Sequence, residues 1–330
     1  MLEIWTGIDP VLAEARLRGL RRRLAELDQA LVDQQALARE NPNSFGIALS
    51  GESLRSIEAA LRLELVDVLR HRQAEKVSIV LDGPSFAQHS AKLADLGVIF
   101  TRLQKLFSSV AQAITTGPTT RGPIRADVMA HTAMRLQAIY ASSFGMNIAV
   151  PSNYNLLGES LPSEALGQLF QLLSAAQSDT HLMRVSGEVG RRSLVHLRQL
   201  ARHLQDNDAK MNVNWKDFAG TQYHWAVDRI SAEKIIFTID NIKETRSETK
   251  RFDGFLVGAS LLRSRFEILL DSGGVLEGKF VNGLVGKVQE TFGKQVTAIM
   301  DETEILDGIS GESRTFYTLK GIDLFDVNTI

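Results

Sequence analysis

The fold is signalled most clearly by residues 252–321, which read FDGFLVGASLLRSRFEILLDSGGVLEGKFVNGLVGKVQETFGKQVTAIMDETEILDGISGESRTFYTLKG. Strand patterns of alternating or continuous apolar residues occur at Phe252–Ala259, Arg265–Leu270, Val275–Val281, Lys294–Met300 and Arg314–Gly321. A short helical pattern separates the third strand from the fourth. The order strand-strand-strand-helix-strand-strand is that of a five-stranded Greek-key barrel of the OB type. Such barrels often bind oligonucleotides, but a fold alone does not fix a function.

The composition is that of a globular protein with more than one domain. The chain has 330 residues, of which 44% are hydrophobic and 23% are charged, and its formal net charge is −2. A chain of this length is expected to form two or three domains. With so little net charge, the molecule has no global field that would attract nucleic acid or an acidic membrane.

The absence of cysteine excludes several kinds of chemistry. Disulfides, cysteine-ligated zinc, iron–sulfur clusters and thiol nucleophiles all require that residue. Residues 1–10 lack the basic-then-apolar layout of a signal peptide, and no run of about 18 apolar residues is long enough to span a membrane. We therefore expect a soluble, cytoplasmic protein that does not enter a membrane.

The N-terminal region predicts a long packed helix. Asp9 followed by Pro10 is a helix-start signal, because an acceptor side chain precedes a proline at the first helical position. Apolar residues then step by three and four at Leu17, Leu20, Leu24, Leu27 and Leu31. The seam ends after two heptads, where Gln34 takes the next position. We interpret this segment as a bundle helix, with a dimerisation arm as the alternative, and its arginines at 16, 18 and 21–23 as a solvated face.

A short stretch of sequence occurs in two similar copies. Ser44–Leu49 predicts a strand that leads through a Gly-Glu-Ser-Leu turn into a helix, and a related pattern begins at Ser143. The regions 44–54 and 143–161 are therefore a possible degenerate repeat of a strand-turn-helix unit.

The remaining body is predicted as a mixture of helices and hairpins. Strands are expected at Val77–Leu81 and Met211–Trp215, a hairpin at Met134–Tyr140 with Phe144–Val150, and helices at Leu93–Ile114, around Leu194–Leu204 and at Ser231–Ile239. A helical interpretation of Ile124–Tyr140 stays open. The polar run Lys243–Arg251 is typical of a linker. The predicted fold class is thus α+β, with a helical and β-hairpin body over residues 1–242 and a small OB-like barrel over residues 251–330.

No catalytic motif is present in the sequence. It contains no phosphate-binding loop, no dinucleotide fingerprint, no nucleophile elbow and no zinc-binding helix. We therefore expect no cofactor and no metal, and the balance is against an enzyme. Asn153, Tyr154 and Asn155 form a polar aromatic loop that could serve recognition, although an ordinary surface loop explains them as well.

The best candidate binding surface is one basic helix. Its candidate residues are Arg191, Arg192, His196, Arg198, Arg202 and His203. The segment from 191 to 203 contains no acidic residue and carries leucines on its other side. Such a face could bind nucleic-acid phosphates, pair with an acidic partner or stay solvated. His196 and His203 are seven residues apart, too far along a helix to chelate one metal ion easily.

Two functional hypotheses follow. The first is a non-enzymatic protein-protein interaction or assembly subunit, with self-association through the N-terminal helices. The second is a nucleic-acid-binding protein that uses the basic helix and the barrel. Within residues 251–321 there are eight Lys or Arg against ten Asp or Glu, and the phenylalanines occupy core-like positions. Non-specific single-strand binders need a positive groove and exposed aromatics, so we favour the first hypothesis.

Overall fold

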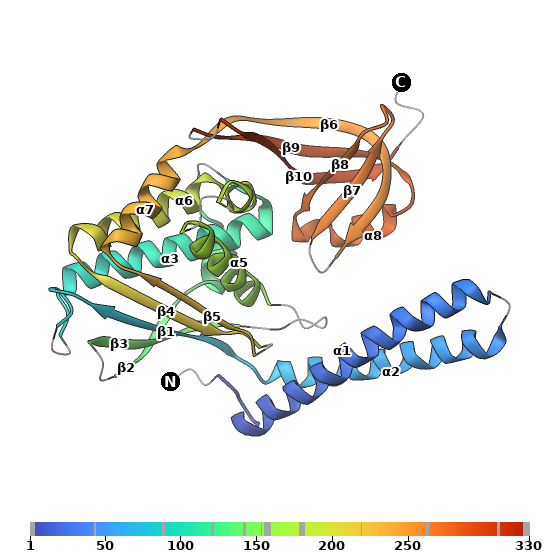
Figure 1. The fold of residues 1–330 in the computed structure, drawn as a ribbon, viewed down its shortest axis with the longest axis horizontal. Coiled ribbons are helices and arrows are strands. Elements are labelled where there is room, and N and C mark those ends of the chain that lie inside the picture. Colours follow the sequence, from blue (N-terminus) through green and yellow to red (C-terminus); the bar gives the residue numbers. More distant parts are fainter. Residues whose placement is uncertain are drawn as a thin grey trace.

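The chain forms three parts: a helical arm, an α+β body and a closed barrel (Figure 1). The computed structural model describes residues 4–42, 44–87, 90–119, 122–140, 143–152, 154, 160–177, 182–218, 220–261, 264–308 and 311–325. Within them, no helix is both long enough and apolar enough to cross a membrane.

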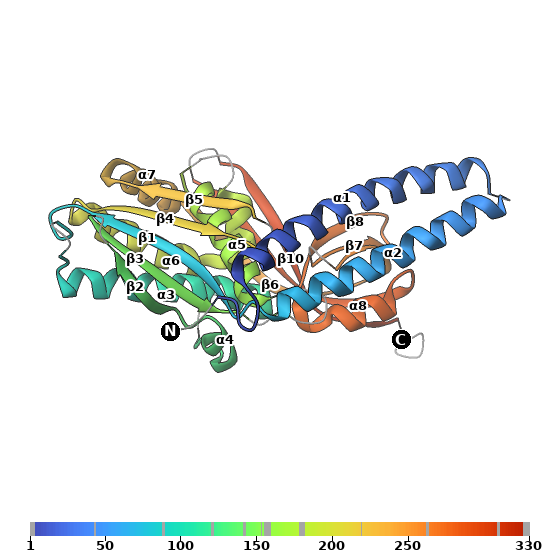
Figure 2. The same cartoon turned by 90° about the horizontal axis from the view of Figure 1, so that it is seen from below.

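The arm is an antiparallel hairpin of two long helices, α1 (Pro10–Glu40) and α2 (Phe45–Arg70). Asp9 caps α1 by accepting hydrogen bonds from the backbone N–H groups of residues 11 and 12. The predicted leucine seam of α1 is buried against α2. Gln34 continues that seam, because its side-chain amide donates to the carbonyl of Ile47 at 2.7 Å. In Figure 1 the arm extends away from the sheet and approaches the body only at its base, and Figure 2 shows its two helices side by side. α1 therefore belongs to a projecting two-helix hairpin and not to a larger bundle, and its role in dimerisation stays a prediction.

The strand predicted at Ser44–Leu49 is wrong. Ser44 is the N-cap of α2, and its side chain accepts from the backbone N–H of Ile47. The corresponding second copy is strand β3 (Phe144–Pro151). The two similar stretches therefore have different secondary structure, and the fold contains no repeated strand-turn-helix unit at these positions.

The body is built on a five-stranded antiparallel sheet with the order β2-β3-β1-β4-β5. The strands are β1 (Ala74–Asp82), β2 (Arg135–Tyr140), β3, β4 (Lys210–Lys216) and β5 (Gln222–Val227). The predicted hairpin is confirmed as β2–β3, although residues 141 and 142 of its expected turn lie outside the described residues. β5 was not predicted, yet Tyr223, Trp225 and Val227 alternate as a half-buried strand requires.

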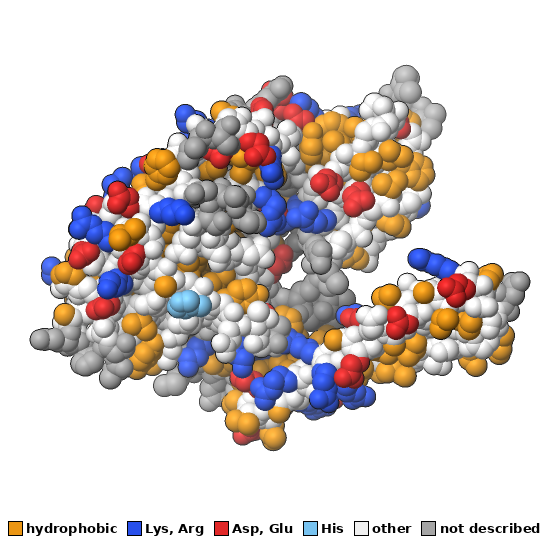
Figure 3. Space-filling view, viewed as in Figure 1, with side chains coloured by type: hydrophobic (Ala, Val, Ile, Leu, Met, Phe, Trp, Pro, Cys, Tyr) orange, Lys and Arg blue, Asp and Glu red, His pale blue; other side chains and the backbone are white. Residues whose placement is uncertain are grey.

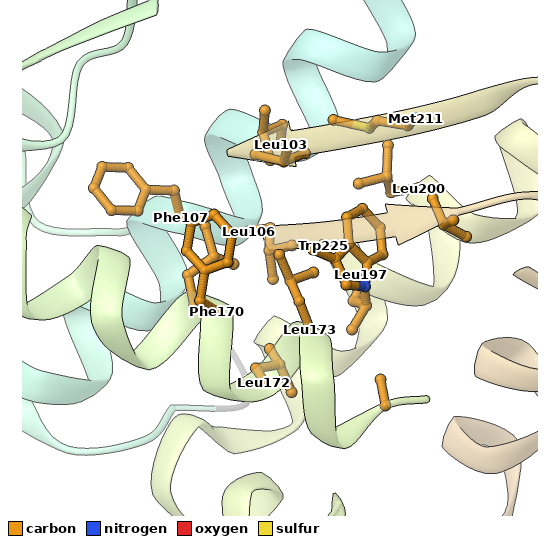
Figure 4. Close-up of a cluster of buried hydrophobic side chains, with 14 of the residues drawn as sticks. Leu103, Leu106, Phe107, Phe170, Leu172, Leu173, Leu197, Leu200, Met211 and Trp225 are labelled. Carbon is orange, nitrogen blue, oxygen red and sulfur yellow. The ribbon is translucent and has the colours of Figure 1, made fainter. Parts of the chain in front are cut away.

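Helices pack on one face of the sheet and form the main core. They are α3 (Leu93–Thr116), α4 (Ala126–His131), α5 (Leu161–Ala175), α6 (Leu182–Asp206) and α7 (Arg229–Asn241). Figure 4 shows the centre of this core, where leucines of α3, α5 and α6 surround Trp225 of β5. α6 is interrupted at Gly190, which has φ 76° and ψ 163°. This glycine divides α6 into two helical halves.

The predicted barrel is confirmed as a closed five-stranded barrel with the order β10-β8-β7-β6-β9. Its elements are β6 (Ile242–Ser260), β7 (Arg265–Leu270), β8 (Val275–Phe280), α8 (Val285–Thr291), β9 (Gln295–Asp307) and β10 (Ser313–Leu324), with a 3-10 turn, η1 (Asn282–Leu284), before α8. The third and fifth strands, β8 and β10, run parallel where the barrel closes. Phe266 and Ile268 of β7 point into its core.

The linker predicted at Lys243–Arg251 is wrong. These residues belong to β6, which begins directly after α7 and pairs with β9 along its whole first half. Over these residues β6 is an edge strand paired with β9, and β9 pairs with β10 on its other side. Most of the described side chains of β6 are exposed here, so the strand shows no apolar alternation. The polar composition of these residues therefore led to the wrong prediction of a linker.

Candidate functional site

The arm exposes apolar side chains along much of its length. Phe45 at the start of α2 is 80% exposed and Leu63 is 71% exposed. Further exposed apolar residues of the arm are Val32, Leu37, Leu49 and Ile57, with Val11 and Leu12 at its base. Orange side chains are accordingly visible along the arm in Figure 3. Large exposed apolar surface on a soluble protein commonly marks a place where a partner binds.

The charges of the arm are distributed unevenly between its two ends. The base, residues 10–24 with 58–70, carries seven arginines and four acidic residues. The tip, residues 25–40 with 45–57, carries two arginines and five acidic residues. The arm therefore has a formal charge of +3 at its base and −3 at its tip. Figure 3 shows Lys and Arg side chains gathered over the base.

A buried carboxylate fixes the base of the arm to the body. Glu75 of β1 is fully buried and accepts from Arg72 at 2.7 Å, from Trp215 Nε1 at 3.0 Å and from the Tyr154 hydroxyl at 2.6 Å. Burial first, and the charge of Glu75 second, raise the pKa of Tyr154. Because both oxygens of Glu75 are occupied, the cluster is organised as a structural anchor.

Two further contacts join the base of α1 to the body. The Arg21 guanidinium lies 4.4 Å from the centre of the Phe218 ring, and Lys216 lies 3.3 Å from Glu14. Of the predicted polar aromatic loop, Tyr154 thus serves this anchor, while Asn153 and Asn155 lie outside the described residues.

The six residues of the predicted basic helix do not form one free surface. Arg198 pairs with Asp240 of α7 through both carboxylate oxygens, at 2.5 and 3.0 Å. Arg192 donates to the carbonyl of Gly122, Arg202 lies 3.4 Å from Gln205, and His203 lies 3.5 Å from Asp95. Among the four arginines, only Arg191 makes no hydrogen bond or ion pair with any described residue. The other three have partners within the chain, and Arg198 is the one that pairs with a carboxylate.

His196 faces α3 in a half-buried position. Burial is the main cause that lowers its pKa, and the cations Lys105, Arg102 and Arg192 lower it further. Its Nδ1 atom is buried and has no hydrogen-bond partner in the described residues. No cluster of three potential metal ligands occurs in the part of the chain that the structure describes.

The outer face of the barrel differs from that of a typical oligonucleotide binder. On β7 and β8, Glu267 stands directly opposite Glu277. The neighbouring pair, Arg265 and Lys279, contacts Glu188 of α6 at 3.2 and 2.9 Å. The positive end of this face therefore adjoins a carboxylate of the body. Phosphate groups would meet like charge at its centre.

The barrel and the body meet along the first half of α6, and two cavities flank this junction. Phe316 of β10 packs against Gly187, where a Cβ atom would lie 2.4 Å from its ring. One cavity, of about 410 Å³, lies beside Glu188 and the basic residues Arg184, Arg265 and Lys279. The other, of about 290 Å³, lies at the interruption of α6 and includes Arg191. Cavities at the boundary between domains are common ligand sites.

The chain matches no family model, and no curated protein is significantly similar to it. The arm and the cavities must therefore be interpreted from their own geometry.

Sequence patterns missed most of these features. They located the basic helix but not the carboxylates beside it, because Asp240 and Asp95 come from distant segments. They did not separate the exposed apolar residues of the arm from core residues. The one available signal was Gly190 within an amphipathic helix, since an isolated glycine there marks a break.

Proposed function

We propose that this protein is a non-enzymatic assembly subunit whose helical arm pairs with the arm of a second copy. The observation that carries this proposal is the set of exposed apolar side chains on an arm that approaches the body only at its base (Figure 1). A hairpin this long is costly to expose without a partner, because apolar surface in water raises the free energy by about 25 cal/mol per Å². A cytoplasmic location remains part of the proposal.

The charge distribution favours one arrangement of the two arms. Homodimers usually have twofold symmetry, so the same surface of each copy meets itself. Side by side in opposite directions, the positive base of one arm lies against the negative tip of the other. Side by side in the same direction, like charges face each other at both ends. Antiparallel pairing is therefore the arrangement that the electrostatics supports.

The rigid base supports this role as well. Glu75 and its three donors hold α2 and the sheet together, so two paired arms would place their bodies at a defined distance. A loosely tethered arm would lose part of its binding free energy in ordering.

Sedimentation equilibrium of the full chain tests the proposal. At micromolar concentration, the wild type is expected to have twice the 36.4 kDa mass of one chain. The variant Leu37→Ser/Phe45→Ser/Leu49→Ser is expected to be a monomer with unchanged helix content, because these side chains are exposed and support no core. Ile230→Ser/Phe237→Ser removes equally exposed apolar residues from α7 and is the matched control. A wild-type monomer, or equal dissociation by both variants, would contradict the proposal.

Nucleic-acid binding is the second candidate, and the strand order of the barrel is what favours it. The pairing of Arg198 and the acidic centre of the outer face count against it. Titration with a single-stranded oligonucleotide at two salt concentrations compares the two functions directly, because phosphate contacts weaken steeply with salt.

A further inference from the structure

The interruption of α6 opens onto a cavity of about 290 Å³ that is separate from the arm. Its walls come from three segments: α6, the residues that follow α3, and the ribbon formed by β6 and β9. The residues that matter for its chemistry are Pro118, Gly190, Arg191, Leu194, Ser247 and Thr303. Its volume is near the lower end of the range for small-molecule pockets.

The cavity has a positive group without a partner. Arg191 lines it and makes no hydrogen bond or ion pair with a described residue, whereas Arg192, Arg198 and Arg202 of the same helix all have partners. No Asp or Glu is among the described residues of the lining. A guanidinium in such surroundings offers paired N–H donors to an oxyanion.

The ribbon supplies polar groups on the opposite wall. Ser247 and Thr303 are directly paired across β6 and β9, so their side chains lie on the same face of the ribbon. Both residues line the cavity, and each hydroxyl can donate to an anion.

Gly190 is required by the shape of the cavity wall. Its φ of 76° lies in the left-handed region, and a Cβ atom there would lie 2.7 Å from Pro118. The helical segment after this break begins at Arg191, so its positive dipole end adjoins the same wall. This field adds to the charge of Arg191.

The cavity also has an apolar part. Leu194 of α6, Ile242 at the start of β6 and Ile305 of β9 form these walls. Leu194 and Ile305 are each 4% exposed and Ile242 is half-buried. A molecule with an apolar body could contact these walls, whereas a free inorganic ion could not.

We propose that this cavity binds a small organic anion, with its phosphate or carboxylate group at Arg191 and its apolar part against Leu194, Ile242 and Ile305. Phosphate and carboxylate share the chemistry that Arg191, Ser247 and Thr303 recognise. The site does not depend on the pairing of the arms, so the two proposals can fail separately.

Isothermal titration calorimetry with three probes tests the site: phenyl phosphate, benzoate and inorganic phosphate, each at constant ionic strength. At least one of the two aromatic probes is expected to bind saturably and more tightly than inorganic phosphate, and the tighter of the two identifies the preferred anionic group. Arg191→Ala is expected to weaken that probe by about tenfold, the loss of one charge-assisted hydrogen-bonded pair. Arg202→Ala, on the same helix but outside the cavity, is expected to leave its affinity unchanged.

Thr303→Val gives a second variant that keeps the shape of the wall and removes one hydroxyl. It is expected to weaken the same probe by several-fold, roughly the effect of one neutral hydrogen bond. Absence of saturable binding by both aromatic probes would overturn the proposal. So would an equal loss of affinity in Arg191→Ala and Arg202→Ala.

Discussion

Replacing Glu75 by glutamine is expected to destabilise the junction between the arm and the body by about 3 kcal/mol, because breaking a buried ion pair typically costs about 3–5 kcal/mol. Glu75 is fully buried and receives donors from Arg72, Tyr154 and Trp215. A glutamine keeps one acceptor oxygen and turns an NH₂ group toward those donors. At least one donor, and the charge of Arg72, would then be left unsatisfied inside the protein.

Urea unfolding followed by circular dichroism, at a fixed protein concentration, measures this loss. The concentration must be constant because pairing of two copies would shift the midpoint. Glu64→Gln is the matched control, since it breaks the ion pair between Glu64 and Arg16 in the same arm. The Arg16 side chain is 51% exposed and the Glu64 side chain is 37% exposed. Exposed pairs contribute about 0–1 kcal/mol. If the two variants lose the same free energy, Glu75 is not the anchor described above.

Two further predictions concern the junction between the barrel and the body, and the position of His196 between α6 and α3. Gly187→Ala should destabilise the contact between the barrel and the body by about 1–3 kcal/mol, because its new methyl group meets the Phe316 ring. Gly167→Ala is the control, since it has open space in α5 and should be neutral or stabilising. Equal susceptibility of the two variants to limited proteolysis would refute this prediction. Burial and nearby cations lower the pKa of His196 from 6.5, so the unfolded chain takes up a proton first as the pH falls. Wild-type stability should therefore be full above about pH 6.5 and decline below it, and the stability of His196→Gln should decline less. An equal fall in the thermal midpoints of the two proteins between about pH 7.5 and about pH 5.5 would refute the assignment of this decline to His196.

The barrel could be predicted from sequence because its core residues repeat at the period of a strand. Phe266 and Ile268 alternate with exposed residues, and the turn residues Asp271–Gly274 separate their strand from the next. The closure of the barrel adds only backbone pairing between β8 and β10, which follows from the strand order.

The arm could be predicted only in part, because its apolar residues serve two purposes. Leu17 and Leu24 form its internal seam, whereas Phe45 and Leu49 are exposed. The strand expectation at Ser44–Leu49 assumed that alternating apolar residues lie on a buried face. In α2 those residues lie on a helix surface instead, so the alternation carried no information about burial.

The candidate sites depend on contacts between residues that are far apart in the chain. Glu75 meets Trp215 across two strands, and Ser247 meets Thr303 across the ribbon. A local sequence pattern cannot predict contacts between residues that are so far apart in the chain. The sequence did identify Arg191, but as one of six basic residues and not as the one without a partner.

The most direct test of the central claim is a set of distances between the arms of two copies. The chain has no cysteine, so single cysteines at Ala15, Ala25 and Gln35 can each carry one spin label without changing the charge of the arm. Pulsed electron–electron double resonance then measures each label against the same label on the other copy. Antiparallel pairing predicts a short distance at residue 25 and about 30 Å at residues 15 and 35, from 1.5 Å per residue over the helix. Short distances at all three positions would show parallel arms, and no defined distance at any position would show that the arms do not pair; either result would contradict the account.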